Sequence, residues 1–380
     1  MAKLILTAEN FAFGPIGKLL NIADLLKKQG HALVFAGFGT SFQLAKNYSF
    51  DATYEIDTDN PASNSELEKV ISEGDMLISS MDLASVVTAK KLGKPIVWLD
   101  CLFWFWESIF EPLFDIDLYI AERSLKFSVN ESLFGPKIKN FYTVGPILPS
   151  IKKTKRKKQA LISYGGGEAA MWYKNGKDTN YSSVITNILL KNVDWSYFDR
   201  VIVTTNEYIL KELSDKFPES VFEFTTCGSH TGFLEELSRS EVLLTTAGLV
   251  TSQEAFESET PVIYLPPSNN SHYLLQDELH DLGLARASVH LTDFMPRLSL
   301  RGKTEDKSIS EVMQQLREVE YSSIMQNEIG KKINNLIQKR TEWSGISIRE
   351  NKEFLKSLGG NGAQPAANKI KHILTVNGFH

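Results

Sequence analysis

The feature that most constrains this chain is a regular alternation of short apolar segments with longer amphipathic ones. Residues 4–7, 32–36 and 95–99 are almost continuously apolar, while residues 18–28 repeat their apolar positions with helical spacing. Strands that are apolar on both sides belong to parallel sheets with helices on both faces. The alternation therefore predicts an α/β fold built on parallel sheet.

A break divides the alternation into two series. Residues 75–79, 119–121 and 141–144 continue the first series, but residues 145–150 then contain two prolines, and six cations follow among residues 152–158. This composition is typical of an exposed linker. The second series has apolar segments at residues 160–164, 200–204, 241–245 and 261–265.

We therefore predict two Rossmann-like parallel-sheet domains that face each other across a cleft. The first covers residues 1–149, a basic linker covers 150–158, and the second domain covers 159–360. Residues 361–380 are expected to form a helix that packs back on the first domain. Such domains bind ligands at the carboxyl ends of their strands. The sequence leaves open the role of the polar segment 286–318.

Charge and cysteine content exclude several classes of function. The 41 Lys and Arg against 46 Asp and Glu give a net charge of −5, which argues against general binding of nucleic acid. Solvent exposure explains the basic linker, and contact with RNA or an anionic membrane is the alternative. Cys101 and Cys227 are too few for a disulfide framework or a Cys-rich zinc site.

The sequence also bears on location. It contains no apolar run of about 18 residues, the length that a membrane-spanning helix needs. Residues 1–10 resemble a first strand more than a signal peptide. We expect a cytoplasmic protein with at most peripheral membrane contact.

Three consecutive glycines, Gly165, Gly166 and Gly167, follow the first apolar segment of the second series. Without Cβ atoms, this backbone can approach an anion and direct N–H groups at it. The alternative is a tight turn made with glycine. The spacing matches neither the Walker A motif nor GxGxxG, so nucleotide hydrolysis and nicotinamide binding are not implied.

A second motif spans residues 245–255. Ala247 and Gly248 permit close approach of a diphosphate, Thr251 and Ser252 can donate to its oxygens, and Glu254 is placed to accept both hydroxyls of a ribose. The alternative is a structural one, in which the hydroxyls cap free N–H groups and Glu254 favours the helix start.

A third motif lies one apolar segment later. Asn269, Asn270 and His272 follow residues 261–265, where amide and imidazole groups suit the hydroxyls of a sugar. A loop rich in turn-forming residues is the alternative.

Together, these three motifs resemble the donor-site signature of GT-B glycosyltransferases. They are most similar to the branch that contains UDP-glycosyltransferases of natural products and the peptidoglycan N-acetylglucosaminyltransferase. Val144-Gly145-Pro146 also resembles the close of that family's N-terminal domain. As architecture, the resemblance covers nearly the whole chain, and its motifs are concentrated in residues 160–280.

The resemblance implies that the second domain binds a nucleotide-sugar, foremost a UDP-sugar, with neither a metal nor another cofactor. Glu254 would bind the ribose, and the backbone near Cys227 and Gly228 the base. The other implied donor contacts fall into three groups: Ala247, Gly248, Thr251 and Ser252 around the diphosphate; Gly165, Gly166 and Gly167 near the diphosphate or the anomeric carbon; and Asn269, Asn270 and His272 at the sugar.

The chain departs from the family at the general base. The family's N-terminal Gly-His corresponds here to Gly14-Pro15, and Thr246 replaces a His that is frequent in the plant branch. Glu9, Asp82 and Asp100 stand at ends of predicted strands and are the candidate bases. We favour Asp100, with Glu9 second, although a carboxylate there can also simply cap a helix.

Aromatic residues suggest the acceptor side. Phe103, Trp104 and Trp106 belong to a run of four aromatics that cannot all face one helix stripe, so they either stack on an acceptor ring or pack against neighbouring aromatics. Residues 11–19, with Phe13 and Gly14, have a faint resemblance to glycosyltransferases that attach a glucuronyl unit to cytosine. Lys18 there either steadies phosphate charge or is a surface lysine.

The resemblance therefore implies an inverting glycosyltransferase that moves a sugar to a small acceptor, with a nucleobase-like ring as one possibility. The alternatives are a nucleotide-sugar epimerase or hydrolase of the same fold, for which only His230 and His272 are available near the sugar, and a non-catalytic binding or activating subunit. A periplasmic-type binding protein is the weakest alternative. The sugar, the acceptor and the oligomeric state stay open.

Overall fold

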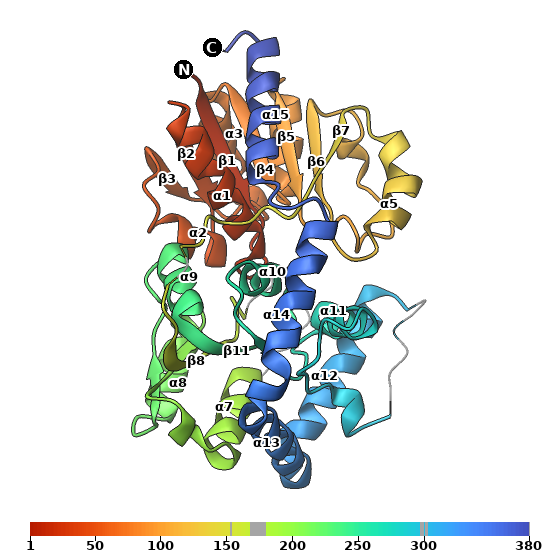
Figure 1. Cartoon of the computed structure of the whole chain (residues 1–380). Helices are drawn as coiled ribbons and strands as arrows, with labels where there is room; N and C mark the ends of the chain where they lie inside the picture. Colours follow the sequence, from red (N-terminus) through yellow and green to blue (C-terminus); the bar gives the residue numbers. More distant parts are fainter. Residues whose placement is uncertain (153, 168–179, 297–299, 301–302, 380) are drawn as a thin grey trace. The chain divides into compact units, whose positions relative to one another are not determined.

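A computed structural model describes residues 1–152, 154–167, 180–296, 300 and 303–379 of the chain. The chain divides into two compact units (Figure 1). Met1–Ser150 and Phe354–His380 form the first unit, and Ile151–Glu353 forms the second. Each unit contains one parallel sheet, which confirms the predicted fold class of two parallel α/β sheets.

The first unit contains a seven-stranded sheet with the order β3-β2-β1-β4-β5-β6-β7. Every residue of the inner strands β4, β5 and β6 is buried, whereas the edge strands β3 and β7 are partly exposed. This burial explains why the inner strands have almost continuously apolar sequences. The strands are β1 Lys3–Ala8, β2 Ala32–Gly37, β3 Ala52–Glu55, β4 Met76–Ser80, β5 Ile96–Asp100, β6 Leu118–Glu122 and β7 Phe141–Val144.

Helices cover both faces of this sheet because side chains alternate along each strand. On β1, Leu4 and Leu6 share a core with α1 and α15, whereas Ile5 belongs to the opposite core with α3 and α4. The terminal helix α15 packs directly against α1. The helices are α1 Gly14–Lys28, α2 Gly39–Ala45, α3 Asn64–Ser72, α4 Leu83–Lys91, α5 Phe127–Phe134 and α15 Ala363–Val376.

The second unit contains a five-stranded parallel sheet with the order β10-β9-β8-β11-β12. Its strands are β8 Lys157–Ser163, β9 Arg200–Thr204, β10 Phe222–Phe224, β11 Ser240–Thr245 and β12 Val262–Tyr264. Its helices are α7 Tyr181–Asn192, α8 Glu207–Lys216, α9 His230–Arg239, α10 Leu249–Glu257, α11 Asn270–Asp281, α12 Glu305–Tyr321, α13 Ser323–Gln338 and α14 Arg340–Ser357, the last of which continues into the first unit.

Most described residues of the basic segment 150–158 are exposed, as expected of a linker, but its end already belongs to the second sheet. Strand β8 already begins at Lys157, and the partly buried Arg156 donates to the carbonyl oxygens of Ser240 at 2.5 Å and Ser258 at 3.2 Å, and also to that of Glu259. A guanidinium group can satisfy several carbonyls at once, so Arg156 ties this segment to the loop before β12.

Each sheet has one point at which the order of its strands reverses. The chain runs from β1 outward to β2 and β3, and then returns to β4 on the other side of β1; β8, β9, β10 and β11 repeat this pattern. The loops after the two strands that flank such a point leave in opposite directions and open a crevice at the carboxyl edge. The crevices therefore lie after β1 and β4, and after β8 and β11.

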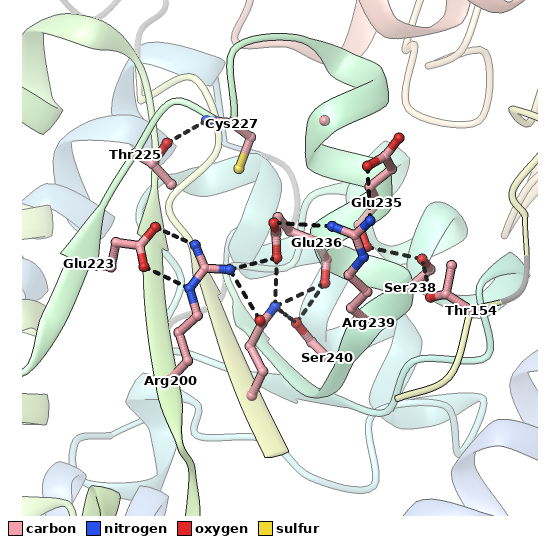
Figure 2. A network of polar contacts seen from close by, with 12 residues as sticks. Thr154, Arg200, Glu223, Thr225, Cys227, Glu235, Glu236, Ser238, Arg239 and Ser240 are labelled. Carbon is pink, nitrogen blue, oxygen red and sulfur yellow. Dashed lines mark hydrogen bonds and ion pairs between the residues drawn. The ribbon is translucent and has the colours of Figure 1, made fainter. Parts of the chain in front are cut away.

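A polar network fixes α9 against the second sheet (Figure 2). Glu236 of α9 accepts from Arg200 at 3.1 Å and from Gln159 at 2.9 Å, and Arg200 also donates to Glu223 of β10 at 2.6 Å. These contacts join one helix to strands β8, β9 and β10. They determine where the first residue of α9, His230, is placed.

Candidate functional site

The donor residues predicted in the second unit all lie at the carboxyl edge of its sheet. Gly165–Gly167 follow β8, Cys227 and Gly228 follow β10, Ala247 and Gly248 follow β11, and Asn269, Asn270 and His272 follow β12. The loops after β8 and β11 flank the crevice. Separate sequence motifs thus meet at one edge.

The glycine turn after β8 needs glycine for its backbone. Gly165 and Gly167 have φ of +65° and +62°, values that side chains rarely adopt. A Cβ atom on Gly167 would lie 2.3 Å from Cδ1 of Ile209. Two buried residues after β9 bond to the turn: Thr205 Oγ1 donates to the Gly165 carbonyl at 2.9 Å, and Asn206 Nδ2 to the Gly166 carbonyl at 2.6 Å. Glu168, which completes the sequence motif, lies outside the described residues.

The turn after β11 leads directly into α10. Gly248 is the N-cap residue in an extended conformation, and Ala247 is fully buried. Of the two predicted hydroxyl donors, Thr251 is partly exposed, whereas Ser252 is buried at 1% exposure. A ligand at the N-terminus of α10 can therefore reach Thr251 more readily than Ser252.

Glu254, one turn into α10, is 3% exposed and contacts His230 of α9. Its Oε1 lies 2.7 Å from Nε2 of His230. The backbone just before His230 turns sharply, with φ of +59° at Cys227 and +69° at Gly228, and Ser229 then caps α9 by accepting from Gly232 N at 3.0 Å. A positive φ is unfavourable for a non-glycine residue such as Cys227, so the surrounding structure must hold this loop in its conformation.

The sequence placed His230 next to the loop expected at the base, and among the groups that an epimerase or hydrolase would use, but did not connect it with Glu254. The position of His230 directly after Cys227-Gly228-Ser229 was the available signal. Its partner, Glu254, lies 24 residues further along the chain. Only the packing of α9 against α10 brings the two side chains together.

His272 is held as a neutral donor. Asn269 caps α11 through Oδ1, which accepts from His272 N at 2.9 Å, so its Nδ2 group donates to Nδ1 of His272 at 3.0 Å. The Ser268 hydroxyl also lies 2.8 Å from Nδ1 and can donate to it. With an accepting Nδ1, the ring proton is assigned to Nε2. Burial lowers the pKa of His272 to about 4, which keeps the ring neutral near pH 7. Nε2 lies 3.7 Å from the point where a Cβ atom on Gly248 would stand, so it faces the turn after β11.

In the first unit, Asp100 ends β5 and is 2% exposed. Oδ1 accepts from Leu102 N at 2.8 Å, and Oδ2 accepts from Trp106 Nε1 at 2.8 Å and from the Tyr119 hydroxyl at 2.5 Å. Burial raises the pKa of Asp100, and these hydrogen bonds oppose the rise. The carboxyl group therefore anchors the aromatic loop, and its role as a base stays a prediction.

The aromatic residues after β5 differ in exposure. Phe103 is fully buried and packs against the rings of Tyr119, Phe127, Phe134 and Phe141. Trp104 is also buried, at 9% exposure, whereas Trp106 is partly exposed. The packing alternative thus describes Phe103, and Trp106 is the most exposed of the three predicted residues in this run.

Lys18 of α1 is not the surface lysine considered from the sequence. Its side chain is 1% exposed, and Nζ donates to Glu122 Oε1 at 2.9 Å and to the Ile147 carbonyl at 3.0 Å. This buried pairing gives Lys18 a structural role inside the first unit.

The remaining predicted residues lie around the crevice of the first sheet. Glu9, partly exposed, and Phe13 follow β1, and Gly14 begins α1. Two non-glycine residues nearby, Ala12 and Met81, have φ of +50° and +65°. The third candidate base, Asp82, caps α4, where its carboxylate accepts from Ser85 N at 3.2 Å and from the Ser85 hydroxyl at 2.5 Å.

The described residues lack two further features. They contain no group of three or more His, Cys, Asp or Glu side chains that could hold a metal ion. No helix within the described part of the chain is both long and apolar enough to cross a membrane.

Comparison with known proteins identifies the fold. No family model matches the sequence, and no curated protein matches it. Solved structures do match: the spinosyn rhamnosyltransferase SpnG at 8% identity and a TM-score of 0.55, covering 99% of this chain and 100% of SpnG. The kitacinnamycin glycotransferase matches at 12% identity and a TM-score of 0.50, with 98% and 99% covered. Arabidopsis thaliana UGT89C1, crystallised with quercetin, matches at 12% identity and 0.50, with 94% and 99% covered. The chain therefore has the GT-B glycosyltransferase fold.

Proposed function

We propose that this chain is a glycosyltransferase that moves a sugar from a nucleoside diphosphate, foremost UDP, to a small-molecule acceptor. The observation that carries the proposal is Glu254, a buried carboxylate one turn into α10 that is oriented by His230 at 2.7 Å. It stands behind a turn of two small residues beside the crevice of the second sheet. A carboxylate accepts hydrogen bonds and donates none, which suits the hydroxyls of a ribose.

The other donor contacts follow from this placement. The diphosphate lies between the glycine turn after β8 and the N-terminus of α10, where Ala247, Gly248 and Thr251 surround it. Backbone N–H groups and the positive end of α10 both stabilise the negative charge of the diphosphate. The helix alone contributes about 0.3–1 kcal/mol. His272, with its proton on Nε2, donates to the diphosphate or the sugar, and Asn269 and Asn270 line the sugar side.

The reaction that we propose is an inverting displacement. A heteroatom of the acceptor attacks the anomeric carbon and gives up its proton to a general base. The bond from that carbon to the diphosphate oxygen breaks, and the nucleoside diphosphate leaves with the electron pair. Preorganised N–H donors stabilise the negative charge that develops on the leaving group. No metal or other cofactor takes part in the proposal.

The acceptor is assigned to the first unit. Trp106 offers a partly exposed ring for stacking on a planar acceptor, such as a nucleobase-like ring. The fold shared with a protein crystallised with quercetin supports a small-molecule acceptor. Of the predicted bases, we favour Glu9, because it borders the crevice and is partly exposed, whereas Asp100 is 2% exposed.

The test is calorimetric titration with UDP, dTDP, GDP and ADP, followed by turnover assays with the corresponding sugars. We expect micromolar binding of one diphosphate, foremost UDP, and its loss in Glu254→Ala. Glu257→Ala is the matched control, because Glu257 ends the same helix but is exposed. Binding of none of the four would contradict the proposal. Release of free sugar without an acceptor would instead indicate a hydrolase.

A further inference from the structure

The two carbonyl groups of the glycine turn are both held from the same side. Thr205 and Asn206 directly follow β9 and are 3% and 1% exposed. The Thr205 hydroxyl donates to the Gly165 carbonyl at 2.9 Å, and Asn206 Nδ2 donates to the Gly166 carbonyl at 2.6 Å. These contacts determine the orientation of two successive peptide planes.

That orientation determines where two N–H groups point. In a trans peptide the N–H bond is directed opposite to the C=O bond, and the described part of the chain contains no cis peptide. The N–H groups of Gly166 and Gly167 therefore point away from the loop after β9. Because β8 lies between β9 and β11 in the sheet, they point toward the side of β11.

The side of β11 is where the crevice opens and where α10 begins. No hydrogen bond among the described residues uses the N–H groups of Gly166 or Gly167. Successive N–H groups that converge in such a turn form a concave anion site, and glycines with positive φ at positions 165 and 167 permit this shape.

We propose that Thr205 and Asn206 are positioning residues that aim the N–H groups of Gly166 and Gly167 at the diphosphate of the donor. This inference rests on the proposed function. Neither side chain touches the ligand. Each side chain holds one carbonyl of the glycine turn and thereby fixes the orientation of that peptide before the ligand binds. Without these contacts, the flexible glycines would lose this orientation easily. Hydrogen bonds from fixed donors to a charged group are stronger than neutral ones.

The two residues allow substitutions that remove only the donor. Thr205→Val keeps the shape and loses the hydroxyl, whereas Thr205→Ser keeps the hydroxyl. Asn206 has a second role, because its Oδ1 caps α8 by accepting from Ile209 N at 2.8 Å. Asn206→Asp keeps that accepting oxygen and replaces the donating Nδ2 with a carboxylate oxygen that repels the Gly166 carbonyl.

The experiment compares UDP with uridine, which lacks the diphosphate, on the full-length chain. Calorimetry gives the Kd for UDP, and ligand-observed NMR gives that for uridine. We expect Thr205→Val and Asn206→Asp to weaken UDP on the order of tenfold while uridine binding stays unchanged. The melting temperature falls in both variants, and further in Asn206→Asp, because the new carboxylate is buried. Thr205→Ser should restore the wild-type Kd for UDP.

The possible failures are distinguishable. If the wild-type chain binds no nucleoside diphosphate, the proposed function fails first. If Glu254→Ala abolishes UDP binding but Thr205→Val and Asn206→Asp bind UDP like the wild type, only the positioning inference is overturned. Equal weakening of UDP and uridine in these variants also overturns it, because the effect would then not involve the diphosphate.

Discussion

The two sheets have the same reversal of strand order but use the polar groups near it differently. In the second unit, buried residues such as Asn206 and Asn269 hold carbonyls and a ring nitrogen, and thereby direct N–H donors toward the crevice. In the first unit, Lys18 and Asp100 are satisfied by protein partners. The same topology thus provides outward-directed donors in one unit and internal anchoring in the other.

Breaking the Lys18–Glu122 pair should have the largest effect. Both side chains are 1% exposed, so Lys18→Met leaves a buried carboxylate without its cation. We expect a loss of about 3–5 kcal/mol in the free energy of unfolding, measured by denaturant titration. The double variant Lys18→Met, Glu122→Leu should recover most of it. A stable Lys18→Met protein with impaired turnover would show instead that Lys18 serves a ligand.

Asp100→Asn separates anchoring from catalysis. The amide keeps one acceptor but presents an NH₂ group to donors that now bond to Oδ1 or Oδ2. We expect the free energy of unfolding to fall by about 1–3 kcal/mol. Tryptophan fluorescence should also change, because Trp106 loses a partner. An unchanged stability together with a collapse of kcat would assign Asp100 as the base and contradict the anchoring role.

His272 should make stability depend on pH. Because burial lowers its pKa from 6.5 to about 4, the unfolded chain binds a proton between these values that the folded chain does not. Stability should therefore fall as the pH drops below 6.5. When the pH is lowered from 7.5 to 5.0, the free energy of unfolding should fall by about 1–2 kcal/mol more in the wild type than in His272→Gln. Denaturant titrations at both pH values measure it, and equal losses would contradict the lowered pKa.

The sequence predicted the second unit in more detail than the first because its signals are local. The turn of small residues at 247–248 and the glycine turn at 165–167 each depend on a few neighbouring residues. The Lys18–Glu122 and Asp100–Tyr119 contacts join residues 104 and 19 positions apart. No local pattern contains such contacts, which is why neither alternative considered for Lys18 was a buried ion pair.

The His230–Glu254 contact could not be predicted for the same reason, although it lies in the second unit. Each residue stood in a recognisable loop, but their distance depends on how α9 and α10 pack. The aromatic run after β5 was ambiguous for another reason. Burial of Phe103 and partial exposure of Trp106 depend on a loop whose shape the Asp100 carboxylate sets.

Gly248→Ala should change stability least and therefore tests the donor crevice most directly. Gly248 has φ of −82°, which alanine adopts freely, and the added Cβ would lie 3.7 Å from Nε2 of His272, an ordinary contact. A poorer N-cap and a less flexible unfolded chain oppose each other, so we expect a change within about 0.5 kcal/mol in the free energy of unfolding.

The methyl group of Ala at this position nevertheless covers the donor face of His272. UDP affinity, measured by calorimetry, should then fall about tenfold, which corresponds to about 1.4 kcal/mol. Unchanged affinity would mean that the diphosphate does not pass between Gly248 and His272, and the contrast between the two crevices would then rest on the glycine turn alone.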